Sequence, residues 1–495
     1  MLAAALTACG STDAPSMTAS SGGGTSGTSS KEPPKESVTL TMMVQSNKAF
    51  PLNKDWMIWD AYKENTGITL DVSAYQGDWW DAIPKIIASK DLPDIMWITT
   101  DDSRKYGADG AFINYLEYEE SMPNFQAWSE EYPREVTPIL SVDGKLYMTP
   151  SHGAYGQYED MMLYRKDVFD KHGIKLPESF DELYDAMVKL KELYPESSPL
   201  YFADLHAFDT FGWSFETKCN FFHDVEANQV KYGPMEDNFR DLVEFAAKAY
   251  EEKLIPLEFG NSDSQKRDKM LSTDNTFMFY GYINQIDRYN TELREANPDF
   301  TLAMMPTPAG TGGKQVVASE MFLGEGLAVT TTSKHKEEAI RYIDYLYSEK
   351  GREAMSWGKE GVTFEIVDGK HQFLPDVQNI TNATVEYGIR SSGNAVWFEE
   401  EALTALMSEE TRNAYETGLN YLAPMSVLSP LSSDETESIM LKTQAIGTCM
   451  EENITKFVLG QQPLSEWDNY VEQLKKLGVE DVLKVYNDAL ARQNG

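Results

Sequence analysis

Three apolar segments alternate with two helical segments near the start of the folded part of this chain. The segments VTLTMMV (38–44), ITLDVSAY (68–75) and DIMWIT (94–99) have the composition of buried strands. Between them, residues 53–67 and 79–90 read as helices, with Asn53 and Asp78 as caps and Gly67 as a stop. A strand–helix–strand–helix–strand order builds a parallel sheet. The pattern therefore predicts an α/β fold with helices on both faces of such a sheet.

Polar side chains follow each of these three predicted strands. In sheets of this kind a ligand binds outside the carboxyl ends of the strands, where such side chains meet. The sequence therefore predicts a binding edge that includes the polar groups of Gln45, Ser46, Asn47, Tyr75, Gln76, Thr99, Thr100, Asp101 and Asp102.

Further elements are expected along the rest of the chain. Apolar runs predict strands at 144–150, 301–306 and 324–330, and a strand that leads into a helix over 277–287. Helical periodicity predicts helices at 178–194 and 336–351, a helix over 465–478 with Ser465 as its cap and Gly478 as its stop, and a last helix from Val479.

The composition limits the classes of function. A chain of 495 residues is too long for one core and should form two or three domains. It has no apolar run of about 18 residues that could cross a membrane as a helix. The formal net charge of −36 disfavours nucleic acid and anionic lipid as partners. The cysteines Cys9, Cys219 and Cys449 have no metal-type spacing, and the last two are expected to be small buried residues unless the fold pairs them.

The first residues, MLAAALTACG, form a short apolar run that ends at a cysteine. Leu6-Thr7-Ala8-Cys9 resembles the lipobox of bacterial lipoproteins, in which the cysteine is acylated and becomes the first residue. The alternative is an ordinary signal peptide with a chance cysteine, and the signal is expected to begin upstream of the given start. Residues 10–37 are rich in Ser, Gly, Thr and Pro and predict a flexible tether.

Several stretches in order resemble the family 1 extracellular solute-binding proteins, the substrate receptors of ABC-type sugar importers, in their long Gram-positive lipoprotein branch. They are DLPDIMWI (91–98), DGKLYMTP (143–150), LYRKDVFDKHGIKLPESFDELYDA (163–186), NPDFTLAMMPTPAGTGGK (297–314), the stretch 326–370, and FVLGQQPLSEWDNYVEQLKKLGV (457–479). The resemblance covers essentially all of the chain after residue 37.

The resemblance implies a type II periplasmic-binding-protein-like fold. Two α/β lobes are joined by three crossings, and ligand binds in the cleft between them. The lobes are expected at 38–150 plus 303–340 and at 151–302 plus 341–495. The implied protein is a lipid-anchored monomer on the outer face of a Gram-positive cell membrane, which captures an oligosaccharide without altering it and delivers it to ABC permease subunits.

One feature of the branch is missing. Many members have an Asp- and Asn-rich calcium loop after the helix that corresponds to 178–194, where this chain reads LYPESSPLYFA (193–203). No calcium-loop pattern occurs elsewhere in the chain. We therefore expect neither a metal nor another cofactor.

Sugars are held by aromatic rings and by amide, carboxylate and guanidinium groups. The strand ends and the resemblance together single out a set of candidate sugar-binding residues, for each of which packing or capping is the alternative role. They are Gln45, Asn47, Trp79, Trp80, Asp101, Tyr155, Tyr158, Trp213, Tyr280, Tyr282 and Trp397. Of Trp79 and Trp80 only one is expected to line the cleft, and Trp357 is expected to be structural.

Two other classes of function remain open. A glycan-active enzyme would need a paired-carboxylate site. The many acids of the chain do not exclude such a pair, but no catalytic motif such as GxSxG or HExxH is present. A ligand-presenting subunit of a sensor would share the fold and the site, and the sequence does not separate it from a transport receptor.

Overall fold

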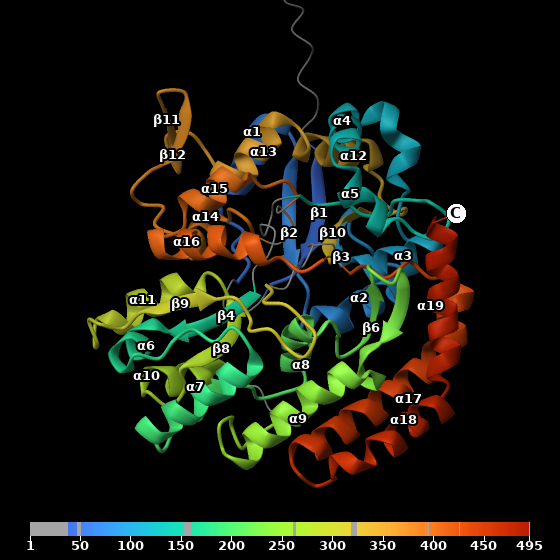
Figure 1. The fold of residues 1–495 in the computed structure, drawn as a ribbon. Helices are drawn as coiled ribbons and strands as arrows, with labels where there is room; N and C mark the ends of the chain where they lie inside the picture. Colours follow the sequence, from blue (N-terminus) through green and yellow to red (C-terminus); the bar gives the residue numbers. More distant parts are fainter. Residues whose placement is uncertain are drawn as a thin grey trace, which may run out of the picture. The chain divides into compact units, whose positions relative to one another are not determined.

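The computed structural model describes residues 38–46, 51–152, 160–260, 264–317, 324–391, 393, 396–424 and 426–494. Its first sheet contains β1 (Thr39–Val44), β2 (Thr69–Ala74), β3 (Ile95–Thr99) and β10 (Glu325–Val329), in the order β10-β3-β1-β2 (Figure 1). The first three strands are parallel, as predicted, and β10 pairs antiparallel with β3. The carboxyl ends of β1, β2 and β3 therefore share one edge of the sheet.

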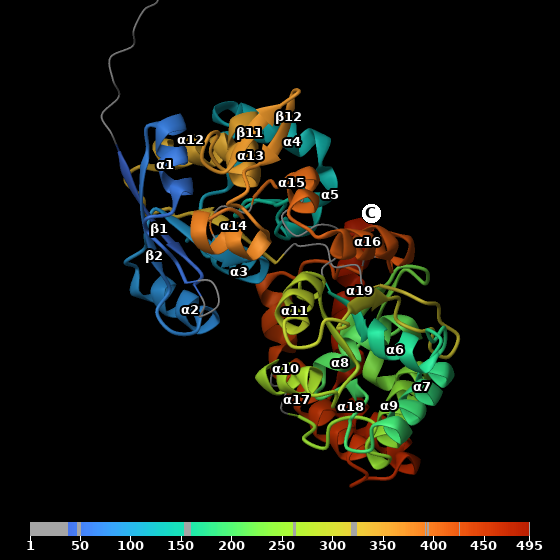
Figure 2. The same ribbon diagram turned by 90° about the vertical axis from the view of Figure 1, so that its left-hand side faces the viewer.

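Helices α1 (Met57–Thr66), α2 (Trp79–Ser89) and α3 (Thr100–Ala108) connect or follow these strands, and Figure 2 shows α1 alongside β1 and β2. Asp78 caps α2 by accepting a hydrogen bond from the Trp80 amide, and Gly67 ends α1 in the left-handed region, both as predicted. The prediction for Asn53 is wrong: α1 begins after Trp56, and the Asn53 side chain accepts instead from the Asp55 amide. The two-residue turn that Asn53 makes precedes the helix.

The predicted strand at 144–150 does not form. Its backbone groups bond to two different segments. The Leu146 carbonyl accepts from the Tyr115 amide, and the Thr149 amide donates to the Leu327 carbonyl of β10. A ladder needs consecutive bonds to one neighbour, which this segment does not have. It nevertheless attaches to β10, because the Leu327 amide donates to the Thr149 hydroxyl at 2.8 Å.

The second sheet contains β4 (Asp160–Arg165), β5 (Leu200–Tyr201), β8 (Met278–Tyr282) and β9 (Leu302–Met305), in the order β5-β8-β4-β9. Strand β4 is antiparallel to both β8 and β9. Alternate side chains of β4 enter two apolar clusters, with Met162 and Tyr164 in one and Met161 and Leu163 in the other. This sheet is therefore buried on both faces.

Two hairpins and most of the remaining helices surround these sheets. The hairpins are β6 (Phe221–Asp224) with β7 (Gln229–Tyr232), and β11 (Phe364–Val367) with β12 (Lys370–Phe373). The helices before β10 are α4 (Pro123–Glu131), α5 (Pro133–Val136), α6 (Lys166–His172), α7 (Phe180–Leu193), α8 (His206–Gly212), α9 (Asp237–Glu251), α10 (Ser264–Ser272) and α11 (Gln285–Arg294).

The helices after β10 divide between the two sheets. Helices α12 (Lys336–Leu346) and α13 (Glu349–Trp357) contribute to the apolar cluster of the first sheet, and α14 (Ile380–Tyr387) and α15 (Glu400–Ala405) to a cluster that also contacts Met57 of α1. The cores of the second sheet include α16 (Glu409–Gly418), α17 (Ser433–Val458), α18 (Trp467–Lys476) and α19 (Val479–Asn494) (Figure 1).

This packing differs from the expected lobe boundaries. The segment from residue 341 to Leu406 was expected with the second sheet, but its buried residues pack with the first sheet and its attached cluster. Strand β9 and Val317, expected in the first lobe, pack in the second sheet's cores. An amphipathic helix shows which of its faces is buried but not which sheet covers that face, so the sequence pattern could not assign these segments.

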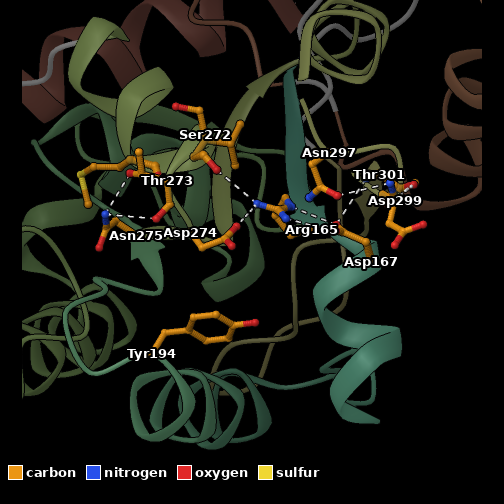
Figure 3. A network of polar contacts seen from close by, with 12 residues as sticks. Arg165, Asp167, Tyr194, Ser272, Thr273, Asp274, Asn275, Asn297, Asp299 and Thr301 are labelled. Atoms are coloured by element: carbon orange, nitrogen blue, oxygen red, sulfur yellow. Dashed lines mark hydrogen bonds and ion pairs between the residues drawn. The ribbon is translucent and has the colours of Figure 1, made fainter. Parts of the chain in front are cut away.

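A buried arginine of β4 joins this strand to α6 and to the end of α10 (Figure 3). Arg165, only 2% exposed, donates from Nε and Nη2 to the two carboxylate oxygens of Asp167, at 2.9 and 2.7 Å. Its Nη1 donates to Asp274, at 2.7 Å, and to the Leu271 carbonyl. Because buried charges are tolerated when they are paired and hydrogen-bonded, we assign Arg165 a structural role between β4 and the end of α10.

The ends of α17 and α19 are joined by an ion pair whose effect should depend on pH. Glu435, at the third position of α17, caps the Ser432 amide and accepts from Arg492 of α19 at 2.7 and 3.1 Å. The Arg492 bonds are the main reason that the pKa of Glu435 is lowered to about 2.

We predict that Glu435→Gln lowers the melting temperature at neutral pH by on the order of 1 °C. A depressed carboxyl pKa stabilises the fold above the unfolded pKa of about 4.3, and this contribution is lost as the pH falls from there toward 2. Thermal denaturation at several pH values should therefore show the difference from the wild type shrinking below about pH 4. An equal difference at pH 7 and pH 3, or an equal effect of Glu437→Gln on the same helix, would contradict the assignment.

Candidate functional site

Trp79 and Trp80 lie near the carboxyl edge of the first sheet, at the start of α2. Trp79 is only 6% exposed and packs on Tyr75, whose hydroxyl donates to the Trp97 carbonyl at 2.8 Å. Trp80 is 59% exposed, and its ring centroid lies 4.6 Å from that of Trp79. Of the two rings, Trp80 is therefore the exposed one and Trp79 belongs to the core.

The acids of this edge differ in accessibility. The Asp101 side chain is 97% exposed and lies 3.8 Å from Arg104. Burial raises the pKa of Tyr486 on α19, and the nearby Asp101 charge adds to this effect. The neighbouring Asp102 accepts from the Thr99 hydroxyl at 2.8 Å, and burial raises its pKa. Asp101 is thus a solvated carboxylate near α19, whereas Asp102 belongs to the start of α3. Gln45, directly after β1, is half-buried.

The second sheet presents Tyr282 at the end of β8. Tyr282 is 52% exposed, whereas the Tyr280 ring is half-buried and contacts Phe211 of α8. Trp213, at the end of α8, has the Lys218 ammonium 3.9 Å above its ring. Trp213 lines a pocket of about 310 Å³, together with Lys218 and the turn of the β6–β7 hairpin. Of the predicted aromatics on this side, Tyr282 is therefore the most accessible.

A larger pocket of about 990 Å³ surrounds Trp397. It is formed by the end of α4, α13, the turn of the β11–β12 hairpin, α15 with its preceding loop, His152, and Arg412 of α16. Its lining comprises Tyr132, His152, Arg352, Trp357, Gly369, Lys370, His371, Trp397, Phe398, Glu399, Glu400, Glu401, Thr404, Ala405 and Arg412.

The Trp397 ring is half-buried and held by neighbours on several sides. The Arg352 guanidinium lies over the ring, 4.6 Å from its centroid. The rings of Trp128 and Tyr132 approach it edge-on, at 6.4 and 6.1 Å. A cation over an aromatic face is attractive, so Arg352 should hold the ring in place. The ring therefore forms a fixed aromatic surface in the pocket wall.

Glu399 connects this aromatic surface to α13. Its Oε2 accepts from Trp357 Nε1 at 2.6 Å, and its Oε1 lies 2.8 Å from Arg352 Nε. The Arg352 N–H is not directed at that oxygen, so the attraction is that of an ion pair rather than of a hydrogen bond. Trp357 was expected to be structural, and it is buried, stacked on His371, and positions Glu399.

The side chain of His152, which also lines the pocket, contacts a carboxylate. His152 Nδ1 is 3.0 Å from Glu135 of α5, and the His152 ring lies 4.1 Å from that of Tyr132. The backbone of His152 bonds to Val396 and Phe398 on either side of Trp397. The pocket thus combines aromatic rings with polar and charged groups that contact one another.

Some predicted residues lie outside the described part of the chain. These are Asn47, Tyr155, Tyr158 and Cys9. Within the described ranges, no helix is both long and apolar enough to span a bilayer, and no three metal-ligating side chains come together.

The pocket contains residues that the sequence analysis missed. Arg352, Glu399, Tyr132 and His152 are far apart in the chain and form no motif. The only usable signal was the run WFEEE (397–401), in which acids follow directly after an aromatic residue. Because the partners of Trp397 come from α4 and α13, their role depends on tertiary packing that a linear pattern does not show.

Comparison with known proteins agrees with this architecture. The chain is 21% identical to the fructooligosaccharide ABC transporter substrate-binding protein FusA of Streptococcus pneumoniae, over 93% of this chain and 92% of FusA. It is 23% identical to the melibiose/raffinose/stachyose-binding protein MelE of Bacillus subtilis, over 50% of this chain and 55% of MelE.

Solved structures of the same fold include that of the alginate-binding protein AlgQ2 without calcium ion. It superposes with a TM-score of 0.78 at 21% identity, covering 92% of this chain and 99% of AlgQ2. The family model of the bacterial extracellular solute-binding proteins matches residues 54–353, more than half of the sequence. The chain therefore belongs to the bacterial extracellular solute-binding protein family.

Proposed function

We propose that this protein is the substrate receptor of an ABC importer and binds an oligosaccharide. The observation that carries the proposal is the pocket around Trp397, found in a member of a solute-binding family. A sugar ring has an apolar face and polar edges, and the pocket offers an aromatic surface beside guanidinium and carboxylate groups. Relatives named for fructooligosaccharides and for raffinose-type sugars support the same class of cargo.

The cargo site extends from the Trp397 pocket to the strand ends. Trp80 and Tyr282 are the accessible rings at the carboxyl ends of α/β strands in the two sheets, where ligands of such folds bind. With Trp213, Tyr280, Gln45 and Asp101 they would supply further contacts. Several aromatic positions suit a cargo of more than one sugar unit, because each ring can support one unit.

The two sheets and their cores form the two lobes. One lobe is residues 38–152 with 324–406, and the other is residues 160–317 with 409–494. Met407 packs in the clusters of both, at the junction of α15 and α16. Arg412 of α16 donates to the carbonyls of Thr404 and Met407 across this junction. A cargo that contacts both lobes would favour the closed arrangement, which the permease recognises.

The amino-terminal segment anchors the receptor. Cys9 carries the lipid, and residues 10–37 connect it to β1. The protein acts as a monomer on the outer face of the membrane and leaves its cargo chemically intact.

A thermal-shift panel of oligosaccharides tests the proposed function. A cargo present at about 100 times its Kd should stabilise the protein by roughly 2.7 kcal/mol. The bound sugar is then recovered and its mass compared with that of the starting material. Stabilisation with intact sugar is the expected result. Recovery of a cleaved sugar would contradict a receptor and favour a glycan-active enzyme.

The aromatic contacts predict the effects of two substitutions. Trp397→Ala and Tyr282→Ala should each weaken binding of the stabilising sugar by tenfold or more, or roughly 1.4 kcal/mol, because each removes a stacking surface. Titration calorimetry measures the change. Leu441→Ala, at a side chain that is 78% exposed on α17, is the control and should leave the affinity unaltered. A variant that binds as tightly as the wild type would remove its aromatic residue from the site.

The anchor predicts the location of the protein in cells. Cys9→Ser should release it from the membrane fraction into the medium, because a serine cannot take the thioether-linked lipid. Fractionation and immunoblotting measure the distribution, with Cys449→Ser as the matched control that keeps Cys9. If the Cys9→Ser protein remains in the membrane fraction, the lipoprotein assignment is wrong.

A further inference from the structure

Two nitrogens of the Arg352 guanidinium have no hydrogen-bond partner among the residues that the structure describes. Its Nε lies 2.8 Å from Glu399, and its guanidinium rests on the Trp397 ring. Its Nη1 and Nη2 atoms make no hydrogen bond to any residue in the described part of the chain. Both the guanidinium and Trp397 line the same pocket. A ligand on the exposed part of the ring would therefore meet guanidinium N–H groups beside it.

Glu399 cannot readily move away from this guanidinium. Its second oxygen accepts from Trp357 Nε1 at 2.6 Å, and its amide donates to the Ser356 hydroxyl at 2.9 Å. Trp357 is itself 3% exposed and packed against Phe373. The carboxylate is thus fixed next to Arg352 whether or not a ligand is present.

The formal charges of the lining Lys, Arg and Glu side chains are balanced. The lining contains the cations Arg352, Lys370 and Arg412 and the carboxylates Glu399, Glu400 and Glu401. A ligand carboxylate placed against Arg352 would lie close to the Glu399 carboxylate. Two like charges at such a short distance repel strongly when they are partly shielded from water. A sugar hydroxyl, which is uncharged, accepts from the same N–H groups without this repulsion.

We propose that Arg352 and Glu399 make the Trp397 pocket selective for a neutral sugar unit over a uronate. Arg352 contacts the cargo as a hydrogen-bond donor, and Glu399 acts as the positioning residue that cancels its charge. The inference rests on the proposed function and narrows its cargo. It separates this chain from relatives named for uronate polymers, such as alginate-binding AlgQ2 and the polygalacturonan/rhamnogalacturonan-binding protein YtcQ of Bacillus subtilis.

Calorimetric titration of the full protein with neutral and uronate probes tests the inference. Kestose and raffinose are the neutral probes, and trigalacturonate and an alginate trimer are the uronate probes. The wild type should bind the better neutral probe at least tenfold more tightly than either uronate. Glu399→Gln should reduce this ratio by tenfold or more by strengthening uronate binding. In this variant no carboxylate beside Arg352 offsets the positive charge of the guanidinium. The glutamine oxygen can still accept from Trp357, so the pocket should stay folded.

Two further variants separate charge from packing. Arg352→Met keeps an extended side chain over Trp397 but removes the donors, and should weaken the neutral probe tenfold without improving the uronates. Glu349→Gln makes the same charge change at an exposed position of α13 outside the pocket lining, and should leave the ratio unchanged.

A wild type that prefers uronates, or a ratio that Glu399→Gln does not alter, overturns the inference and leaves the proposed function standing. Failure of all four probes and of the wider panel overturns both.

Discussion

The last strand of the first sheet, β10, comes after all the strands of the second sheet in the order of the chain. Strand β10 begins at Glu325, beyond β9, and pairs with β3 from a distance of more than two hundred residues. Tyr115 holds it there: its hydroxyl donates to the Leu327 carbonyl at 3.0 Å and accepts from the Val329 amide at 3.2 Å. Since β10 must return to β3, the chain has to pass between two separate cores, and each core has to be assembled from distant segments.

The Trp397 pocket is a consequence of that return. After β10, helices α12 and α13 pack on the first core, which brings Arg352 and Trp357 beside the end of α4. The chain then places Trp397 next to His152 through paired backbone bonds to Val396 and Phe398. It leaves the first core at Met407, where α16 begins the packing of the second. The aromatic surface and the junction between the cores are therefore built from the same stretch of chain.

Local patterns predicted the first three strands because the apolar and β-branched residues of these segments are enough to indicate buried strands. Leu40, Met42 and Val44 alternate as a sheet face requires, and Asp78 and Gly67 have the cap and stop chemistry of helices. The cap at Asn53 was missed because its side chain makes a turn before the helix instead. The helices at 336–351 were expected as one, but Ser348 caps a second helix through the Gly351 amide. In each case a local hydrogen bond competed with the periodic signal.

The candidate site was harder to predict because its side-chain contacts depend on the tertiary structure. The sequence named Trp397, the pair Trp79 and Trp80, and the pair Tyr280 and Tyr282 among the candidate sugar-binding residues, without choosing within either pair. It could also show that Asp101 follows a strand. It could not show that Arg352 lies over Trp397 or that Trp357 orients Glu399, since these contacts join residues from different helices. The segment from 341 to Leu406 was likewise assigned to the other sheet, because helix amphipathicity does not identify the surface that covers it.

A crystal structure of the protein with a bound neutral oligosaccharide tests the central claim most directly. The account predicts a sugar unit against the exposed part of the Trp397 ring, with an Arg352 Nη atom about 2.7–3.2 Å from a sugar oxygen and the Glu399–Trp357 hydrogen bond unchanged. Further sugar units should contact Trp80 or Tyr282. An oligosaccharide that binds elsewhere and leaves the Trp397 pocket filled only with water would contradict the account.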